Sequence, residues 1–127
     1  MILCDTSVFF AIFRGNEAVE AELKDIGYSN AAICDITIGE IYLGMRKSEE
    51  RDTKELIRRF NRFAFTKDAS RLFIEIMANL YSRQIGVPDA LIAAIARANS
   101  LEVFTPNIDD FKRVDGLKLY KPSRKLV

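Results

Sequence analysis

The chain has 127 residues, of which 49% are hydrophobic, and a formal net charge of +1. This length and composition predict one globular domain, residues 1–127, and the overall charge gives no reason to expect nucleic-acid binding. Histidine is absent, which excludes Ser/His/Asp catalysis, Cys/His catalysis and histidine-ligated zinc.

Short apolar runs alternate with stretches of helical spacing along the chain. In the first half, the pattern predicts a strand at 1–4, helices at 8–14 and 17–26, a strand at 31–34 and helices at 36–46 and 48–63. In the second half, it predicts a brief strand at 65–66, a helix at 69–84, a helix from residue 88, a strand at 101–104, a short helix at 107–114 and a strand at 117–120. This alternation predicts an α/β fold with a parallel sheet of about four to five strands, covered by helices on both sides.

Acidic residues interrupt the apolar segments at four places: Asp5, Glu40, Asp89 and the pair Asp109/Asp110. Each has a simpler interpretation. Asp5 and Asp89 could cap helices, Glu40 could pair with a base at an exposed helix edge, and the pair could belong to a solvated turn. Of that pair, Asp110 is favoured, because residues three apart in a helix share a side and Asn107 lies three before it.

The four acids agree in one respect, since all fall at strand-to-helix junctions or on helices packed over the sheet. Removing several carboxylates from water is costly unless a cation compensates for their charge. Acids that converge therefore indicate a divalent-metal site, and an all-oxygen set of ligands suits Mg²⁺ or Mn²⁺.

Cys4 and Cys34 lie in predicted strands without any zinc-binding spacing. We expect small buried hydrophobic side chains there, with a structural disulfide as the less favoured alternative. No basic leader, cleavage site or apolar stretch of about 18 residues is recognisable, so we expect a cytoplasmic protein with no membrane partner.

Four ordered segments carry a resemblance to a known family: Asp5-Thr6-Ser7, residues 36–41, residues 85–94 and residues 105–111. In this respect the chain resembles the PIN domain, and within it the VapC-like ribonuclease toxins of toxin–antitoxin pairs. The resemblance implies an endoribonuclease that depends on one or two Mg²⁺ or Mn²⁺ ions and hydrolyses RNA with a metal-activated water. The implied catalytic and metal-binding residues are Asp5, Glu40, Asp89 and Asp110, with Ser7, Thr105 and Asn107 as polar support.

The resemblance also implies a homodimer and a small antitoxin protein that fills an apolar groove. Two features depart from the family pattern: Pro106 stands where a polar residue is usual, and Asp35 is an extra acid near the helix of Glu40.

Because an acidic site repels RNA, basic residues at its rim must supply the binding energy. The candidates are Arg46, Lys47 and Arg51, although interleaved acids favour an ordinary solvated helix face for this segment.

Two alternatives remain open from the sequence. One is a receiver-like phosphoacceptor domain, which is also an α/β fold with acids that bind magnesium, but the chain has no lysine at a suitable strand end. The other is a PIN-like binding module without catalytic activity, which the complete set of four acids disfavours.

Overall fold

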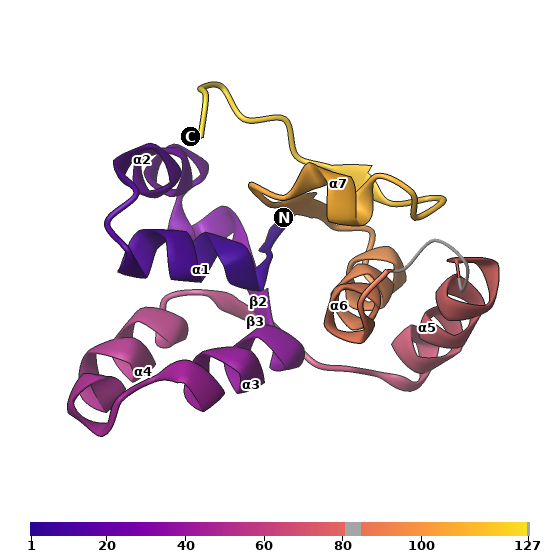
Figure 1. Ribbon diagram of the computed structural model, residues 1–127, viewed down its shortest axis with the longest axis horizontal. Coiled ribbons are helices and arrows are strands. Elements are labelled where there is room, and N and C mark those ends of the chain that lie inside the picture. Colours follow the sequence, from indigo (N-terminus) through magenta and orange to yellow (C-terminus); the bar gives the residue numbers. More distant parts are fainter. Residues whose placement is uncertain (81–84, 127) are drawn as a thin grey trace.

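A computed structural model describes residues 1–80 and 85–126 (Figure 1). Five parallel strands form one sheet in the order β3-β2-β1-β4-β5. The strands are β1 (Ile2–Cys4), β2 (Ala31–Cys34), β3 (Asn61–Phe63), β4 (Glu102–Phe104) and β5 (Lys118–Leu119). Every residue of β1 and β2 is buried, as expected for parallel strands covered on both faces.

Helices cover the two faces of this sheet, with α1, α2 and α4 on one side and α5 and α6 on the other (Figure 1). The helices are α1 (Thr6–Phe13), α2 (Glu17–Ile26), α3 (Asp35–Gly44), α4 (Glu50–Arg58), α5 (Lys67–Leu80), α6 (Val87–Ala98) and α7 (Ile108–Phe111), with short 3-10 turns η1 (Tyr28–Asn30) and η2 (Lys47–Glu49). The predicted fold class, a parallel sheet covered on both sides, is confirmed.

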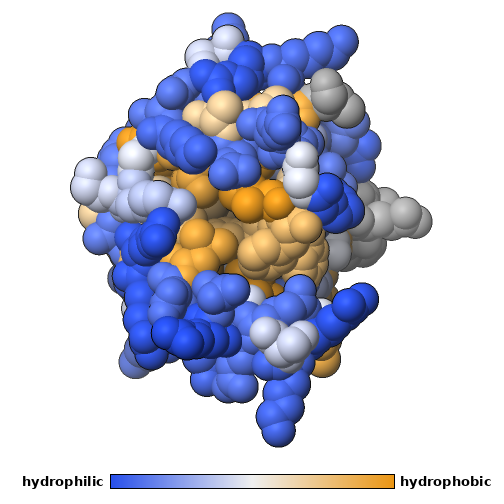
Figure 2. Space-filling view, turned by 90° about the vertical axis from the view of Figure 1, so that its left-hand side faces the viewer, coloured by the Kyte–Doolittle hydropathy of each residue, from blue (hydrophilic) through white to orange (hydrophobic). Residues whose placement is uncertain are grey.

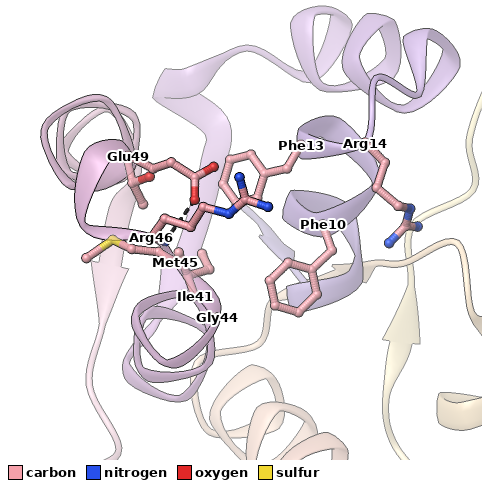
Figure 3. Close-up of a pocket in the computed structure, with 9 residues that line it drawn as sticks. Phe10, Phe13, Arg14, Ile41, Gly44, Met45, Arg46 and Glu49 are labelled. Carbon is pink, nitrogen blue, oxygen red and sulfur yellow. Dashed lines mark hydrogen bonds between the residues drawn. The ribbon is translucent and has the colours of Figure 1, made fainter.

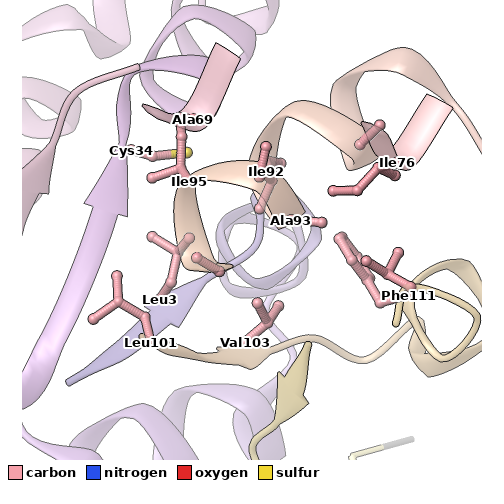
Figure 4. Close-up of a cluster of buried hydrophobic side chains, with 14 of the residues drawn as sticks. Leu3, Cys34, Ala69, Ile76, Ile92, Ala93, Ile95, Leu101, Val103 and Phe111 are labelled. Carbon is pink, nitrogen blue, oxygen red and sulfur yellow. The ribbon is translucent and has the colours of Figure 1, made fainter. Parts of the chain in front are cut away.

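Each face of the sheet has its own hydrophobic core. One core is built around α6, where Ile92 and Ala93 pack with Val103 of β4 (Figure 4). The other core contains Phe9 of α1 and Ile33 of β2. The apolar run of α6 predicted a helix covered on most sides, and the structure confirms that burial.

Two predicted boundaries in the middle of the chain are wrong. The helix expected at 48–63 ends as α4 at Arg58, and the third strand lies at Asn61–Phe63 instead of at Phe65-Thr66. The side chain of Asn61 explains the early stop, because its Nδ2 donates to the carbonyl oxygens of Tyr28, Ser29 and Ala31 at 3.0–3.3 Å. These contacts fix the start of β3 beside β2.

The other boundaries shift less. The helix expected at 107–114 is confined to α7 at Ile108–Phe111, and the last strand shortens to Lys118–Leu119. The end of the helix expected at 69–84, including the inward position expected for Tyr81, lies outside the described residues. Cys4 and Cys34 are both buried and free, so the disulfide alternative is wrong.

The strand order places β1 between β2 and β4. From β1 the strands continue outward to β2 and β3 on one side, whereas β4 and β5 lie on the other side. The carboxyl ends of β1 and β4 therefore form the topological switch point of the sheet, which is where α/β folds bind ligands. This order also excludes the receiver-like alternative, because in receiver domains β1 lies between β2 and β3.

A buried carboxylate fixes the C-terminal segment onto α2. Glu22 is 0% exposed and accepts hydrogen bonds from the Tyr120 hydroxyl at 2.7 Å and the Ser123 amide at 2.8 Å. Its Oε2 also lies 3.2 Å from Nε of Arg124. Burial raises the pKa of Glu22, but these hydrogen bonds and the Arg124 charge outweigh it and hold the pKa below its ordinary value.

Candidate functional site

Asp5 directly follows β1 and precedes the first residue of α1. Only 3% of it is exposed. Its Oδ2 accepts hydrogen bonds from the Ser7 hydroxyl and from Thr105 Oγ1, the latter at 2.8 Å. Burial raises the pKa of Asp5, and these hydrogen bonds oppose that rise. The predicted supporting residues Ser7 and Thr105 thus both contact Asp5, and Thr105 reaches it from the end of β4.

Glu40 lies on α3 and is half-buried. Its Oε1 accepts a hydrogen bond from Thr6 Oγ1 at 2.8 Å. Because Thr6 is the residue after Asp5, this contact brings the α3 carboxylate to the beginning of α1.

Asp89 lies in the first turn of α6 and is also half-buried. Burial is the largest cause that raises its pKa to about 6, and the negative charges of Asp5, Asp110 and Glu40 follow in that order. Asp5, Glu40 and Asp110 therefore each lie within electrostatic reach of Asp89. We call these four predicted acids the acidic centre.

The last member of the acidic centre is Asp110 and not its neighbour. Asp109 forms an ion pair with Lys112 at 2.8 Å, which lowers its pKa, whereas the charge of Asp110 acts on Asp89. The backbone amide of Asn107 donates to Thr105 Oγ1 at 2.9 Å, and its side chain is exposed. Asn107 therefore supports the loop through its backbone.

Asp35, the extra acid near the helix of Glu40, has a structural role. Its carboxylate accepts a hydrogen bond from Arg62 Nε at 2.8 Å and another from the Phe65 amide at 3.2 Å. These contacts fix the chain where it leaves β3, so both carboxylate oxygens of Asp35 are occupied outside the acidic centre.

The chemistry of the acidic centre fits a hard divalent cation. Among the described residues, no group of three or more acidic or cysteine side chains lies close enough to hold one ion between them. Magnesium does not require such a group, because it commonly keeps several water ligands and takes only one or two carboxylates. The like charges that raise the pKa of Asp89 are the charges that such a cation neutralises.

Comparison with known proteins agrees with this geometry. The family model described as "PIN domain" matches residues 2–117. The chain belongs to the PIN domain family. This PIN domain is 28% identical over 128 residues to Ribonuclease VapC of Rickettsia bellii, with 93% of each chain covered.

Two solved structures have the same fold as this PIN domain. One is a toxin–antitoxin complex from Klebsiella pneumoniae, with 26% identity, coverage of 92% of this chain and 95% of that one, and a TM-score of 0.80. The other is VapBC2 from Rickettsia felis bound to a DNA fragment from their promoter, with 27% identity, coverage of 94% and 98%, and a TM-score of 0.78. The family resemblance predicted from the sequence is therefore confirmed.

Outside the acidic centre, the PIN domain has an apolar groove between α1 and α3. Figure 2 shows this side of the molecule hollowed and hydrophobic at its middle. The cavity, of about 410 Å³, is lined by Phe10, Phe13, Ile41 and Met45, with Arg14, Arg46 and Glu49 at its rim (Figure 3). Phe13 is 48% exposed, so the PIN domain leaves a large aromatic surface in contact with water.

The predicted RNA-binding residues lie apart from the acidic centre of the PIN domain. Arg46 lies at the rim of the apolar groove, Lys47 lies on η2 and Arg51 lies on α4. Basic side chains recur on one helical face of this segment: Lys47, Arg51, Lys54 and Arg58. Two of these cations are paired within the helix, Lys54 with Glu50 at 2.7 Å and Arg51 with Glu55 at 3.7 Å. Within the described part of the PIN domain, no carboxylate forms an ion pair with Lys47 or Arg58.

Sequence reasoning missed two polar residues of the PIN domain site, Thr6 and Thr37. Their hydroxyl oxygens lie 2.9 Å apart, and Thr6 also contacts Glu40. A signal did exist in the sequence, because Thr37 lies three residues before Glu40 and such residues share one side of a helix.

None of the helices in the described residues is both long and apolar enough to cross a membrane.

Proposed function

We propose that this PIN domain is a metal-dependent endoribonuclease and the toxin of a toxin–antitoxin pair, acting in the cytoplasm. One observation carries the proposal: burial, followed by the charges of three other carboxylates, raises the pKa of Asp89 at the switch point of the sheet. Similarity to Ribonuclease VapC over 93% of both chains supports RNA as the substrate.

In this proposal Asp5 and Asp89 bind the cation directly, and Glu40 and Asp110 complete its surroundings. Bound Mg²⁺ or Mn²⁺, as one or two ions, supplies Lewis-acid polarisation of the phosphodiester and a water nucleophile at neutral pH. The described ligand set supports this choice of metal, because all its donors are oxygens.

The remaining residues of the site act by holding these acids in place. Ser7 and Thr105 orient Asp5 through its Oδ2, and the Asn107 amide fixes Thr105 in turn. Asp89 must be ionised to bind a cation, and its pKa of about 6 means that it is ionised at neutral pH and loses its charge below that value.

RNA must overcome the negative charge of the acidic centre, so cations elsewhere on the surface must attract its phosphates. Arg46, Lys47 and Arg51 serve this purpose in our proposal. Lys47 is the best placed of them, because Arg51 shares its charge with Glu55 and Arg46 lies beside Glu49 at the groove.

The apolar groove is the proposed docking site for an antitoxin segment, and we also expect the chain to form a homodimer. The groove has an aromatic floor with arginines at its rim, a composition typical of the buried centre of protein interfaces. Solved structures similar to this chain are described as a toxin–antitoxin complex and as VapBC2, which supports a protein partner of this kind.

The test of the proposed function is cleavage of a structured RNA by the purified chain in Mg²⁺, in Mn²⁺ and with a chelator. We expect cleavage only with metal, and at least a 100-fold loss in rate in both Asp5→Asn and Asp89→Asn. Asp109→Asn is the matched control, because Asp109 is exposed and paired with Lys112, and it should cleave at the wild-type rate. A folded wild-type chain that never cleaves RNA would instead support a PIN-like binding module without catalysis.

A further inference from the structure

Two buried hydroxyl groups connect Glu40 to the interior of the protein. Thr37, in the first turn of α3, is 0% exposed, and Thr6, at the start of α1, is 5% exposed. Thr37 Oγ1 lies 2.9 Å from Thr6 Oγ1, and Thr6 Oγ1 donates to Glu40 Oε1 at 2.8 Å. The Cys34 thiol contacts Thr37 Oγ1 at 3.7 Å.

The direction of these hydrogen bonds follows from counting protons. A threonine hydroxyl has one proton to donate. Thr6 gives its proton to Glu40, so the proton between the two threonines must come from Thr37. Thr37 then accepts from the Cys34 thiol, which stays protonated because burial raises its pKa. The donors therefore point one way, and the row ends at the Glu40 carboxylate.

Two buried hydroxyls need hydrogen-bond partners that an apolar pair would not need. A buried hydroxyl must be hydrogen-bonded, or it costs about 1–3 kcal/mol, and valine fills nearly the same space without that requirement. Here the hydroxyls meet their requirement through Glu40, and they link α1 to α3 at the acidic centre. In the described residues, no group donates a hydrogen bond to the other oxygen, Oε2.

We propose that Thr6 and Thr37 are positioning residues that hold Oε1 of Glu40 through a one-way row of hydroxyl donors, so that Oε2 is left for the cation. This inference rests on the proposed metal-dependent function. It gives Glu40 a support separate from that of Asp5, which relies on Ser7 and Thr105.

The first experiment is titration calorimetry of the full chain with Mn²⁺, without RNA. Loss of an outer hydrogen bond to a ligand commonly weakens metal affinity by roughly tenfold or more, so we expect about a tenfold weaker affinity for Thr37→Val. Thr37→Ser keeps the hydroxyl and should bind within about twofold of wild type. Thr53→Val is the matched control, because Thr53 is buried in α4 and takes no part in this row. Thermal unfolding of each variant identifies a temperature at which all are folded.

The second experiment repeats the Thr37→Val change in a Glu40→Gln background. If Thr37 acts through Glu40, its removal should change Mn²⁺ affinity by less than about twofold once the carboxylate is absent. Equal losses in both backgrounds, or a wild-type affinity for Thr37→Val, would overturn the positioning role while leaving the nuclease intact. A wild-type chain that neither binds Mn²⁺ nor cleaves RNA would overturn both this inference and the proposed function.

Discussion

Thr105 Oγ1 donates a hydrogen bond of 2.8 Å to Asp5 Oδ2 across 100 residues of sequence. The two residues follow β4 and β1, which are neighbours in the sheet. The same hydroxyl oxygen accepts from the Asn107 amide. One side chain therefore fixes the position of the buried acid and the start of the last loop together.

Replacing Thr105 by valine should weaken both the site and the fold. Asp5 loses a donor that lowers its pKa, so we expect the pH profile of RNA cleavage to shift toward higher pH. The lost hydrogen bonds should lower the free energy of unfolding by about 1–2 kcal/mol in urea. Thr105→Ser keeps the hydroxyl and should resemble wild type in both measurements; equal behaviour of the valine and serine variants would contradict this role.

Asp89 should make the metal-free protein less stable as pH rises. Its pKa is about 6 when folded and 3.8 when it is unperturbed, so the folded state binds more protons between these values and stability falls as pH rises through that window. The full difference corresponds to about 3 kcal/mol, but screening by water at this half-buried group reduces our expectation to about 1 kcal/mol.

Asp89→Asn should therefore stabilise the chain at pH 7.5 in the presence of a chelator, and by less at pH 5. Thermal unfolding at the two pH values measures this. Asp109→Asn is the control, because Lys112 lowers the pKa of Asp109 and its removal should give no gain at pH 7.5. If Asp89→Asn is no more stable than wild type at pH 7.5, the charges do not converge as described.

Glu22→Gln tests how strongly the C-terminal segment is fixed to α2. The change removes the charge that accepts hydrogen bonds from Tyr120 and Ser123 and that pairs with Arg124, which keeps Asp25 as a second partner. We expect a loss of about 2 kcal/mol in urea unfolding at pH 7. The loss should shrink in acid, because the pKa of Glu22 is lower in the folded than in the unfolded state. The charged carboxylate therefore stabilises the fold at pH values above its unfolded pKa, and this stabilisation disappears as pH falls through its folded pKa. Glu20→Gln, which breaks only an exposed pair with Lys24, should cost less than about 0.5 kcal/mol.

Phe13→Glu tests the proposed role of the apolar groove. We expect a small antitoxin encoded beside this chain to co-purify with the wild-type protein but not with this variant, because a buried charge opposes docking on an aromatic floor. RNA cleavage by the variant alone should be unchanged. Ile74→Glu is the control, because Ile74 is 63% exposed on α5, over the other face of the sheet, and it should still co-purify.

Lys47→Glu tests the basic face of η2 and α4. The variant should bind single-stranded RNA more weakly, and the magnitude of the negative slope of log affinity against log salt should decrease by about one. Lys24→Glu, on the exposed surface of α2, should leave that slope unchanged. Equal slopes for wild type and Lys47→Glu would show that Lys47 makes no phosphate contact.

The acidic centre could be predicted because two signals in the sequence combine: acids at the junctions of apolar segments with helices, and the alternation of strands and helices. Asp5 and Asp89 each stand where an apolar segment meets a helix start, and the alternation of strands and helices predicts that such junctions meet at one edge of the sheet. Helical spacing and the family resemblance both favour Asp110 over Asp109, and the Asp109–Lys112 pair agrees with that prediction.

The boundaries of α4 and β3 could not be predicted because the local signal favours the wrong answer. Ile57, Phe60 and Phe63 recur every three residues, as in one face of a helix. The contacts that end the helix come from Asn61, whose amide reaches carbonyl oxygens about thirty residues away. Similarly, the link from Thr6 to Glu40 joins two helices that periodicity describes separately.

The position of β4 has a consequence for the growing polypeptide. β4 supplies a strand neighbour for β1, and Thr105 then fastens Asp5, so a nascent chain that has not yet released residues 102–105 lacks a finished acidic centre. Cleavage competence should accordingly arise only after β4, Thr105 and Asp110 have all left the ribosome and joined the sheet.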